Sequence, residues 1–322
     1  MAGTVEAPRV YRMPLIRPTI QGRRASVRAP MHALIAALLL AAPPEHDFSK
    51  VEIQTSKVAG SVWFLKGAGG NIAASVGEDG VAIIDDQFAP LSPKIHAALA
   101  KLSAKPVRFL INTHWHFDHT GGNALFSDTA AILAHENVRK RLIAGGNIFG
   151  MEIKPAPPPA LPVVTFRDGL SLWWNGEEIR ALAPGRGHTD GDLVVWFTKS
   201  NVVHFGDDFV TYGFPFVDLQ SGGSVKGMIA ALDVVLGQVP ADAKVIPGHG
   251  EVSTIADVRK FRGALDEMVG VVKKGLAGGK SVEQLQKEHA LAPWEPAWGG
   301  KDKFISAEAF IATIAQDLAA KK

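Results

Sequence analysis

A short run of metal-binding residue types constrains this chain more than any other feature. The run His-Trp-His-Phe-Asp-His begins at His114, directly after the apolar stretch 107–111, which is typical of a short buried strand. Alternate side chains of an extended segment point the same way, so His114 and His116 can hold one ion while Asp118 and His119 face a second position. Histidine together with carboxylate suits zinc, manganese or iron. The run therefore predicts a metal centre at a strand end.

This His-x-His-x-Asp-His spacing resembles the signature of the metallo-β-lactamase-fold hydrolases. The resemblance implies further ligands downstream, each at the end of a strand. Three residues meet that expectation, namely His188 after the stretch 178–183, Asp207 after 202–203 and His249 after 245–246. The resemblance covers residues 51–262. It implies an α+β fold, a four-layer αβ/βα sandwich in which helices flank two mixed β-sheets.

The resemblance also implies how the ligands divide between two ions. The implied ligands are His114, His116 and His188 for one ion, Asp118, His119 and His249 for the other, and Asp207 as a bridge. Two zinc ions per chain are expected, with iron or manganese as alternatives. In such a site a metal-activated hydroxide attacks an acyl carbonyl. We expect Asp118 to be catalytic, because its carboxylate can pass the proton onward.

Two further residues are weaker candidates for the site. Asp85 ends the predicted strand 81–84, where family members carry an aspartate that supports a metal ligand from outside. An ordinary turn aspartate is the alternative. Tyr212 lies in the aromatic stretch 209–216 next to Asp207 and is a candidate to hold the oxyanion, unless it packs in the core.

Single positions separate the branches of the family. His116 argues against the di-iron flavoprotein branch, which has glutamate there. Asp207 resembles the bridging aspartate of the hydroxyacyl-glutathione hydrolase and lactonase branches, whereas lactamases have cysteine or serine. Val210 stands where one lactamase class has a lysine. We therefore predict hydrolysis of a small-molecule ester, lactone, thioester or lactam.

Three alternatives remain open at this stage. One is a periplasmic class B-like β-lactamase, and another is a mononuclear iron persulfide dioxygenase, which shares part of the ligand set. The third is a binding protein that kept the fold without catalysis. A binding protein would have lost ligands, and every implied ligand is present.

Composition narrows the class of partner. The chain has 322 residues, 47% of them hydrophobic, which is enough for a sizeable core. It contains no cysteine, which excludes disulfides, thiolate ligands and a cysteine nucleophile. Residues 1–30 carry six arginines and one glutamate, so the remainder has 28 basic and 31 acidic residues. No nucleic-acid partner is expected for the folded part.

The N-terminal segment resembles a targeting signal. A largely apolar stretch of twelve residues, 31–42, follows Arg23, Arg24 and Arg28. It is too short to span a bilayer but fits the core of a secretory signal. We predict a signal, leader or disordered segment at 1–45 and a hydrolase domain with C-terminal helices at 46–322. A signal implies a periplasmic or secreted protein without stable membrane insertion. The alternatives to a signal are a disordered tail or an over-long start before a true Met31, and the protein is otherwise expected to be cytoplasmic.

Periodicity predicts an alternation of short strands and helices. Hairpins are expected at 51–66 and 72–84, joined by a glycine-rich rim at 67–71. The segment 163–183 is strand-rich, with a turn closed by Asn175-Gly176. We expect 143–161 to be a long loop that covers the site as a flap through Phe149 and Met151. The other expected strands are 107–111, 130–134, 193–197, 202–203 and 245–246, and the expected helices are 92–105, 136–142, 221–237, 254–275, 281–290 and 305–320.

Overall fold

A seven-stranded mixed sheet forms the first half of the computed structural model, which describes residues 47–299 and 304–320. Its spatial order is β1-β2-β3-β4-β5-β6-β9. The first four strands pair antiparallel, and β4, β5, β6 and β9 pair parallel. The strands are β1 (Gln54–Ala59), β2 (Val62–Lys66), β3 (Ile72–Gly77), β4 (Gly80–Ile84), β5 (Val107–Ile111), β6 (Ala131–His135) and β9 (Val164–Phe166).

A six-stranded mixed sheet forms the second half, with the spatial order β10-β11-β12-β13-β14-β15. Only β13 and β14 pair parallel. A two-residue turn joins β10 and β11 at Asn175 and Gly176, which both have positive φ angles, as the Asn-Gly signal predicts. The strands are β10 (Gly169–Trp174), β11 (Glu177–Leu182), β12 (Val194–Phe197), β13 (Val202–His204), β14 (Lys244–Ile246) and β15 (Ser253–Thr254).

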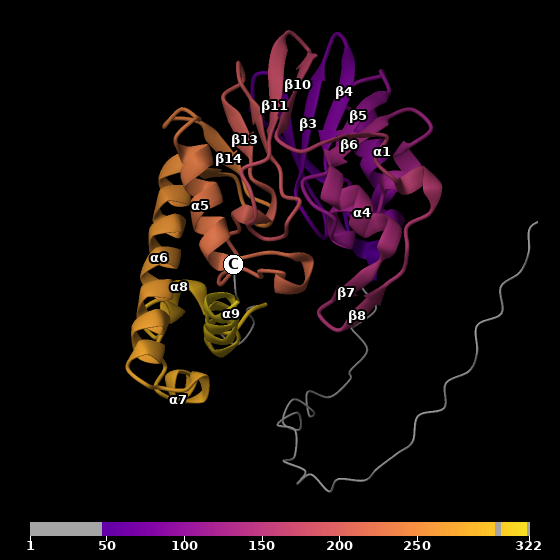
Figure 1. The fold of residues 1–322 in the computed structure, drawn as a ribbon. Coiled ribbons are helices and arrows are strands. Elements are labelled where there is room, and N and C mark those ends of the chain that lie inside the picture. The colour runs from indigo at the N-terminus through magenta and orange to yellow at the C-terminus, as the bar shows by residue number, and fades with distance from the viewer. Residues whose placement is uncertain (1–46, 300–303, 321–322) are drawn as a thin grey trace, which may run out of the picture. The chain divides into compact units, whose positions relative to one another are not determined.

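Helices cover the outer face of each sheet (Figure 1). Those that accompany the first sheet are α1 (Ser92–Ala100), α2 (Phe117–Thr120), α3 (Asn123–Phe126) and α4 (Glu136–Ala144). Those that follow the strands of the second sheet are α5 (Val225–Leu236), α6 (Ile255–Ala277), α7 (Val282–Lys287), α8 (Glu295–Trp298) and α9 (Ala307–Ala319). Short 3-10 turns lie at Phe48–Lys50, Ala89–Leu91, Pro158–Ala160, Gly206–Asp208 and Leu219–Ser221.

Three apolar layers hold these elements together. Ile95 and Leu99 of α1 pack on the first sheet, and Ile111 packs against residues of the second sheet between the two sheets. The third and largest layer lies between the second sheet and α5, α6 and α9. The order is therefore helix, sheet, sheet, helix, and the predicted four-layer α+β sandwich is confirmed.

The predicted loop 143–161 is wrong in its first half, which is a β-hairpin. β7 (Gly146–Ile148) pairs with β8 (Met151–Ile153) across the turn residues Phe149 and Gly150, both with positive φ angles. The Asn147 side chain accepts a hydrogen bond from the Gly150 amide at 2.8 Å and supports the turn. A bulky aromatic residue is unusual in this backbone region, so the sequence did not indicate a hairpin here.

Helix ends also differ from the prediction. α1 ends at Ala100 rather than at 105, with Lys101 as its C-cap. α7 ends at Lys287, and the short α8 was not predicted. The predicted leader 1–45 lies outside the described residues. Among the helices of 47–299 and 304–320, none is both long and apolar enough to cross a membrane.

Candidate metal centre

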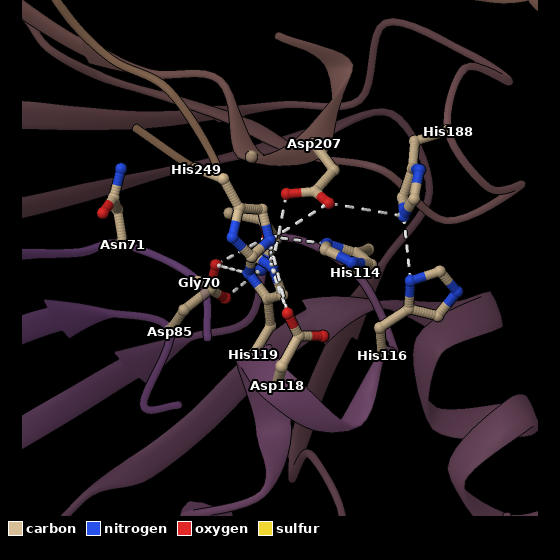
Figure 2. Close-up of polar contacts among 12 residues, drawn as sticks. Gly70, Asn71, Asp85, His114, His116, Asp118, His119, His188, Asp207 and His249 are labelled. Atoms are coloured by element: carbon tan, nitrogen blue, oxygen red, sulfur yellow. Dashed lines mark hydrogen bonds and ion pairs between the residues drawn. The ribbon is translucent and has the colours of Figure 1, made fainter. Parts of the chain in front are cut away.

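The implied ligands lie where the strands of both sheets end, and Figure 2 shows their side chains converging. His114 and His116 follow β5, and Asp118 and His119 lie on the single turn of α2. His188 lies between β11 and β12, Asp207 follows β13 and His249 follows β14. Residues separated by up to 135 positions thus meet at one place.

The first set consists of His114, His116 and His188, whose potential ligand atoms lie within 4.8 Å of one another. His188 Nε2 is 2.9 Å from His116 Nδ1. The ring of His114 lies 4.7 Å from that of His116 and 4.6 Å from that of His188, centroid to centroid. All three residues are buried. This arrangement can enclose one cation.

The second set consists of Asp118, His119 and His249, again with all potential ligand atoms within 4.8 Å. Asp118 Oδ2 is 3.3 Å from His249 Nε2, and His119 Nε2 is 3.2 Å from the same nitrogen. Asp207 lies between the sets, with Oδ1 3.2 Å from His119 Nε2 and Oδ2 3.8 Å from His188 Nε2. Its carboxylate therefore faces both sets.

Asp85 contacts ligands through its buried carboxylate and follows β4 with a positive φ angle of 63°. Its Oδ2 accepts a hydrogen bond from His119 Nδ1 at 2.8 Å and one from the Thr113 hydroxyl at 2.7 Å. Because that hydroxyl donates to Asp85, its lone pair is free to accept from His114 Nδ1 at 3.0 Å. The other ring nitrogen of each histidine, Nε2, then faces the centre without its proton.

Two residues of the stretch 209–220 contact the first set in the same way. The Phe216 carbonyl accepts a hydrogen bond from His188 Nδ1 at 2.8 Å. The Asp218 carboxylate accepts one from His116 Nε2 at 3.0 Å. His188 Nε2 and His116 Nδ1 are thereby left to face the centre. The sequence alone did not single out Phe216 or Asp218 as site residues.

The residues fit a metal centre rather than a network of hydrogen bonds. His114 Nε2 is buried and has no hydrogen-bond partner within the described residues, although it points at the other donors. The backbone of two glycines, Gly70 and Gly248, also lies so close to the candidate ligands that no side chain fits at either position. A Cβ on Gly70 would lie 2.2 Å from the His119 ring, and one on Gly248 would lie 2.0 Å from Asp207 Oδ1. Bare nitrogens and carboxylates in a tight, buried space are what a divalent cation binds.

The two sets differ in their protonation. Burial and the neighbouring imidazoles hold the pKa of His114 well below its usual value, and burial and His116 lower that of His188. Burial opposes the charged form of His249, but Asp207 and Asp118 raise its pKa to about 9. Burial opposes the ionised form of Asp118, but His119 and His249 lower its pKa to about 2. The second set is thus a charged network, whereas in the first set His114 and His188 are neutral.

A pair of buried aspartates, Asp192 and Asp208, supports the loop that carries His188. Asp208 Oδ1 accepts a hydrogen bond from the His188 amide at 3.0 Å, and Asp192 Oδ2 accepts one from the Thr189 amide at 2.8 Å. Burial, together with the neighbouring carboxylate, raises the pKa of Asp208. Both residues flank predicted ligands, but the sequence carries no sign that they are buried.

Asn71 holds the loop of His249 from the opposite sheet (Figure 2). Its side-chain amide donates to the carbonyls of Pro247 and Gly250, each at 2.9 Å, and its backbone amide donates to the Gly248 carbonyl at 2.7 Å. The predicted glycine-rich rim 67–71 therefore does lie at the site, and it connects the two sheets there.

Aromatic rings line one side of the centre. Phe216 packs against His116 and His188, and the flap residue Phe149 lies over Phe216 with ring centroids 3.8 Å apart. The Tyr212 ring lies 5.8 Å from that of His249. Burial and Asp207 raise the pKa of Tyr212 well above its usual value, and its hydroxyl accepts from the Phe216 amide at 3.3 Å.

Curated proteins similar to this chain carry several names. A 2,4-dinitroanisole O-demethylase subunit alpha of Nocardioides sp. is 30% identical over 49% of this chain and 46% of its own length. A probable metallo-hydrolase of Methanocaldococcus jannaschii is 28% identical over 48% of this chain and 75% of its own length. A hydroxyacylglutathione hydrolase of Polaromonas sp. is 28% identical over 53% of this chain and 58% of its own length. The chain thus spans less than half of the first relative.

Two solved structures and a family model all match this chain to metallo-beta-lactamases. The crystal structure of the DIM-1 metallo-beta-lactamase has a TM-score of 0.56 at 18% identity, covering 68% of this chain and 99% of its own. A metallo-beta-lactamase from Pontibacter korlensis has a TM-score of 0.54 at 18% identity, covering 67% and 99%. The family model matches residues 65–270, well over half of the chain. The predicted family is confirmed: this chain belongs to the metallo-beta-lactamase superfamily.

Proposed function

We propose that the chain is a binuclear, zinc-dependent hydrolase that cleaves an acyl bond in a small molecule. The observation that carries this proposal is the convergence of two three-residue sets on the shared carboxylate of Asp207. A structural zinc site is closed by four ligands, whereas two adjacent sets with a bridging carboxylate are typical of hydrolytic centres. The substrate is an ester, lactone, thioester or lactam.

Zinc is the proposed metal because imidazole and carboxylate are its usual donors when thiolate is absent. The proposed ligands are His114, His116 and His188 for one ion, Asp118, His119 and His249 for the other, and Asp207 for both. When bound, such ions would lower the pKa of water to about 7 and polarise a carbonyl oxygen.

Asp118 is the proposed proton acceptor. Its pKa of about 2 keeps the carboxylate ionised at neutral pH, and its side chain is 21% exposed, so a reacting group can reach it. A carboxylate in this position can take a proton from water and later give it to the leaving group. Tyr212 lies on the same side and stays protonated, so its hydroxyl is the proposed donor to the developing oxyanion.

The surroundings of the centre support an uncharged or apolar substrate group. Phe149 and Phe216 offer ring faces beside the first set, and Val210 supplies no charge to grip a carboxylate. The relatives include a hydroxyacylglutathione hydrolase and a 2,4-dinitroanisole O-demethylase subunit, so both a thioester and 2,4-dinitroanisole belong among the compounds to test.

The proposed domain organisation is a single hydrolase domain at 46–322 preceded by a leader at 1–45. The apolar stretch 31–42 behind three arginines supports export to the periplasm or beyond the cell. N-terminal sequencing of the mature protein recovered from cell fractions tests this, because export predicts a new N-terminus near residue 45.

The deciding experiment combines metal analysis with a hydrolysis panel. Purified protein is loaded with zinc and assayed on chromogenic lactams, lactones and thioesters and on 2,4-dinitroanisole, and its metal content is measured. We expect about two zinc ions per chain and turnover of at least one acyl substrate, lost with a chelator and restored by zinc. One iron per chain with oxygen uptake on a persulfide would overturn the proposal in favour of an iron dioxygenase.

A further inference from the structure

We propose that Asp218 is a positioning residue that sets the metal affinity of the first set and leaves the second set unaffected. The inference rests on the proposed metal centre and adds to it a residue outside the ligand set. Asp218 lies in the stretch between the 3-10 turn that carries Asp207 and helix α5, where no sequence motif marked it. Three contacts of this residue and its neighbour Phe216 carry the argument.

The side chain of Asp218 orients His116. Oδ2 accepts a hydrogen bond from His116 Nε2 at 3.0 Å, and both side chains are only 4% exposed. This contact holds the proton on Nε2 and directs Nδ1 toward His188 Nε2, 2.9 Å away. A carboxylate that accepts from a histidine fixes both the tautomer and the ring plane and makes the free nitrogen a better donor.

The backbone of the same stretch orients His188. The Asp218 amide donates to the His188 carbonyl at 2.9 Å, and the Phe216 carbonyl accepts from His188 Nδ1 at 2.8 Å. His188 is therefore held at its ring and at its main chain by two residues that are two positions apart. Through these contacts one short stretch positions two of the three ligands of the first set.

Asp218 is itself held rigidly. Its Oδ1 accepts from the Ser221 amide at 3.0 Å at the start of the 3-10 turn Leu219–Ser221, and its carbonyl accepts from the Gly223 amide at 2.8 Å. Because the hydrogen bond from Ser221 fixes Oδ1, the carboxylate cannot rotate freely and Oδ2 stays directed at His116. This rigidity lets a neighbouring residue impose a geometry on His116.

The second set has a different support. His119 is oriented by Asp85, which follows β4 of the first sheet, and not by Asp218. Asp218 therefore stands behind His116, whereas Asp85 stands behind His119 and, through the Thr113 hydroxyl, behind His114. Removal of the Asp218 contact is expected to weaken one position without the other.

The test uses the Asp218→Asn variant, which keeps the size of the side chain. An amide has one acceptor where the carboxylate has two, so it can accept from Ser221 or from His116 Nε2 but not from both. Zinc affinity is measured by competition with a chromogenic chelator in two backgrounds. His249→Ala leaves the first set intact, and His188→Ala leaves the second set intact.

We expect Asp218→Asn to weaken zinc binding about 10- to 100-fold in the His249→Ala background and less than twofold in the His188→Ala background. Asp233→Asn, the same substitution at an exposed site on α5, should change neither affinity. Unchanged binding in the first background, or equal weakening in both, would overturn the inference. Equal weakening would mean that Asp218 merely supports the fold.

A proton signal gives a second readout. In the zinc-loaded protein without other substitutions, the His116 Nε2 proton should be protected from exchange and visible by NMR, and Asp218→Asn should remove it while the fold is retained by circular dichroism. A protein that shows these metal effects but hydrolyses none of the panel compounds would refute the proposed function and leave this inference standing. Absence of zinc binding in the unsubstituted protein would refute both.

Discussion

The two candidate ligand sets, three histidines in one and an aspartate with two histidines in the other, differ in how far they reach solvent. His114, His116 and His188 are 1 to 3% exposed. In the second set the side chains of Asp118 and His249 are 21% and 24% exposed. The first set is enclosed by groups that bind its outer nitrogens, whereas the second opens outward. We infer that water and substrate reach the centre from the side of the second set.

The two sets also differ in charge, because only the second has an acidic residue among its three members. The first set is buried beside other imidazoles, which keeps His114 and His188 neutral. The second set contains carboxylates, which raise the pKa of His249 and that of His119. We infer that the buried set, in which His114 and His188 are neutral, suits a tightly held cation, whereas the charged, more open set suits the exchange of protons during a reaction.

The largest expected effect is the loss of activity when a residue of the second set is replaced. His249→Ala or Asp118→Ala should reduce kcat/KM by on the order of 10³-fold or more, because each removes a ligand or the proton acceptor at the reacting side. Both residues are partly exposed, so the circular dichroism spectrum should be retained. Full turnover by either variant would refute the assignment of two metals.

The next largest effect is a difference between the two sets in how their zinc affinity depends on pH. Below a pKa of about 9, zinc must displace a proton from His249, so affinity at the second set should rise about tenfold per pH unit for each displaced proton. From pH 7 to pH 9 that is about 100-fold for one proton. His114 and His188, whose pKa values are lowered, are already neutral at pH 7, so the first set should change little. Chelator competition in the His188→Ala and His249→Ala backgrounds measures each set.

A glycine substitution tests how tightly the shared carboxylate is packed. In Gly248→Ala the new Cβ would lie 2.0 Å from Asp207 Oδ1 and 2.6 Å from the Gly206 backbone. We expect a loss of about 1–3 kcal/mol in the free energy of unfolding, together with weaker metal binding at the adjacent second set.

The matched control is Gly263→Ala, since Gly263 lies inside α6 with nothing within 4 Å of an added Cβ. Alanine should stabilise the helix there by about 0.5–1 kcal/mol. Urea denaturation measures both variants. Equal effects of the two substitutions would show that the close approach at Gly248 is unimportant.

The smallest expected effect concerns the flap over the first set. Phe149→Ala removes the ring that packs on Phe216, and we expect KM for apolar substrates to rise about two- to tenfold with little change in kcat. Trp173→Ala, on the exposed edge strand β10, should leave both constants unchanged. A large fall in kcat would mean that the flap acts on the chemistry and not on binding alone.

Much of the architecture followed from local patterns. Apolar runs predicted most strands, the Asn175-Gly176 pair predicted its hairpin, and the superfamily signature implied the order of the layers. The hairpin at Phe149 and Gly150 was missed because its turn residues carry no standard signal. Whether the seven implied ligands bind metal stays a prediction, although the structure brings all of them together.

The sequence by itself determined the kind of site, because a histidine- and aspartate-rich run behind a buried strand has few other uses. It also determined where most strands and helices lie, since periodicity and turn residues are local properties. Only the tertiary structure decided what stands behind the ligands, namely Asp218, Asn71 and the Phe216 carbonyl. The partners of Asp218 and Asn71 lie 102 and 176 positions away and that of Phe216 lies 28 positions away, and no local pattern encodes which distant group will face which ring. It also decided that one set is closed and the other open, because exposure depends on the packing of the whole chain.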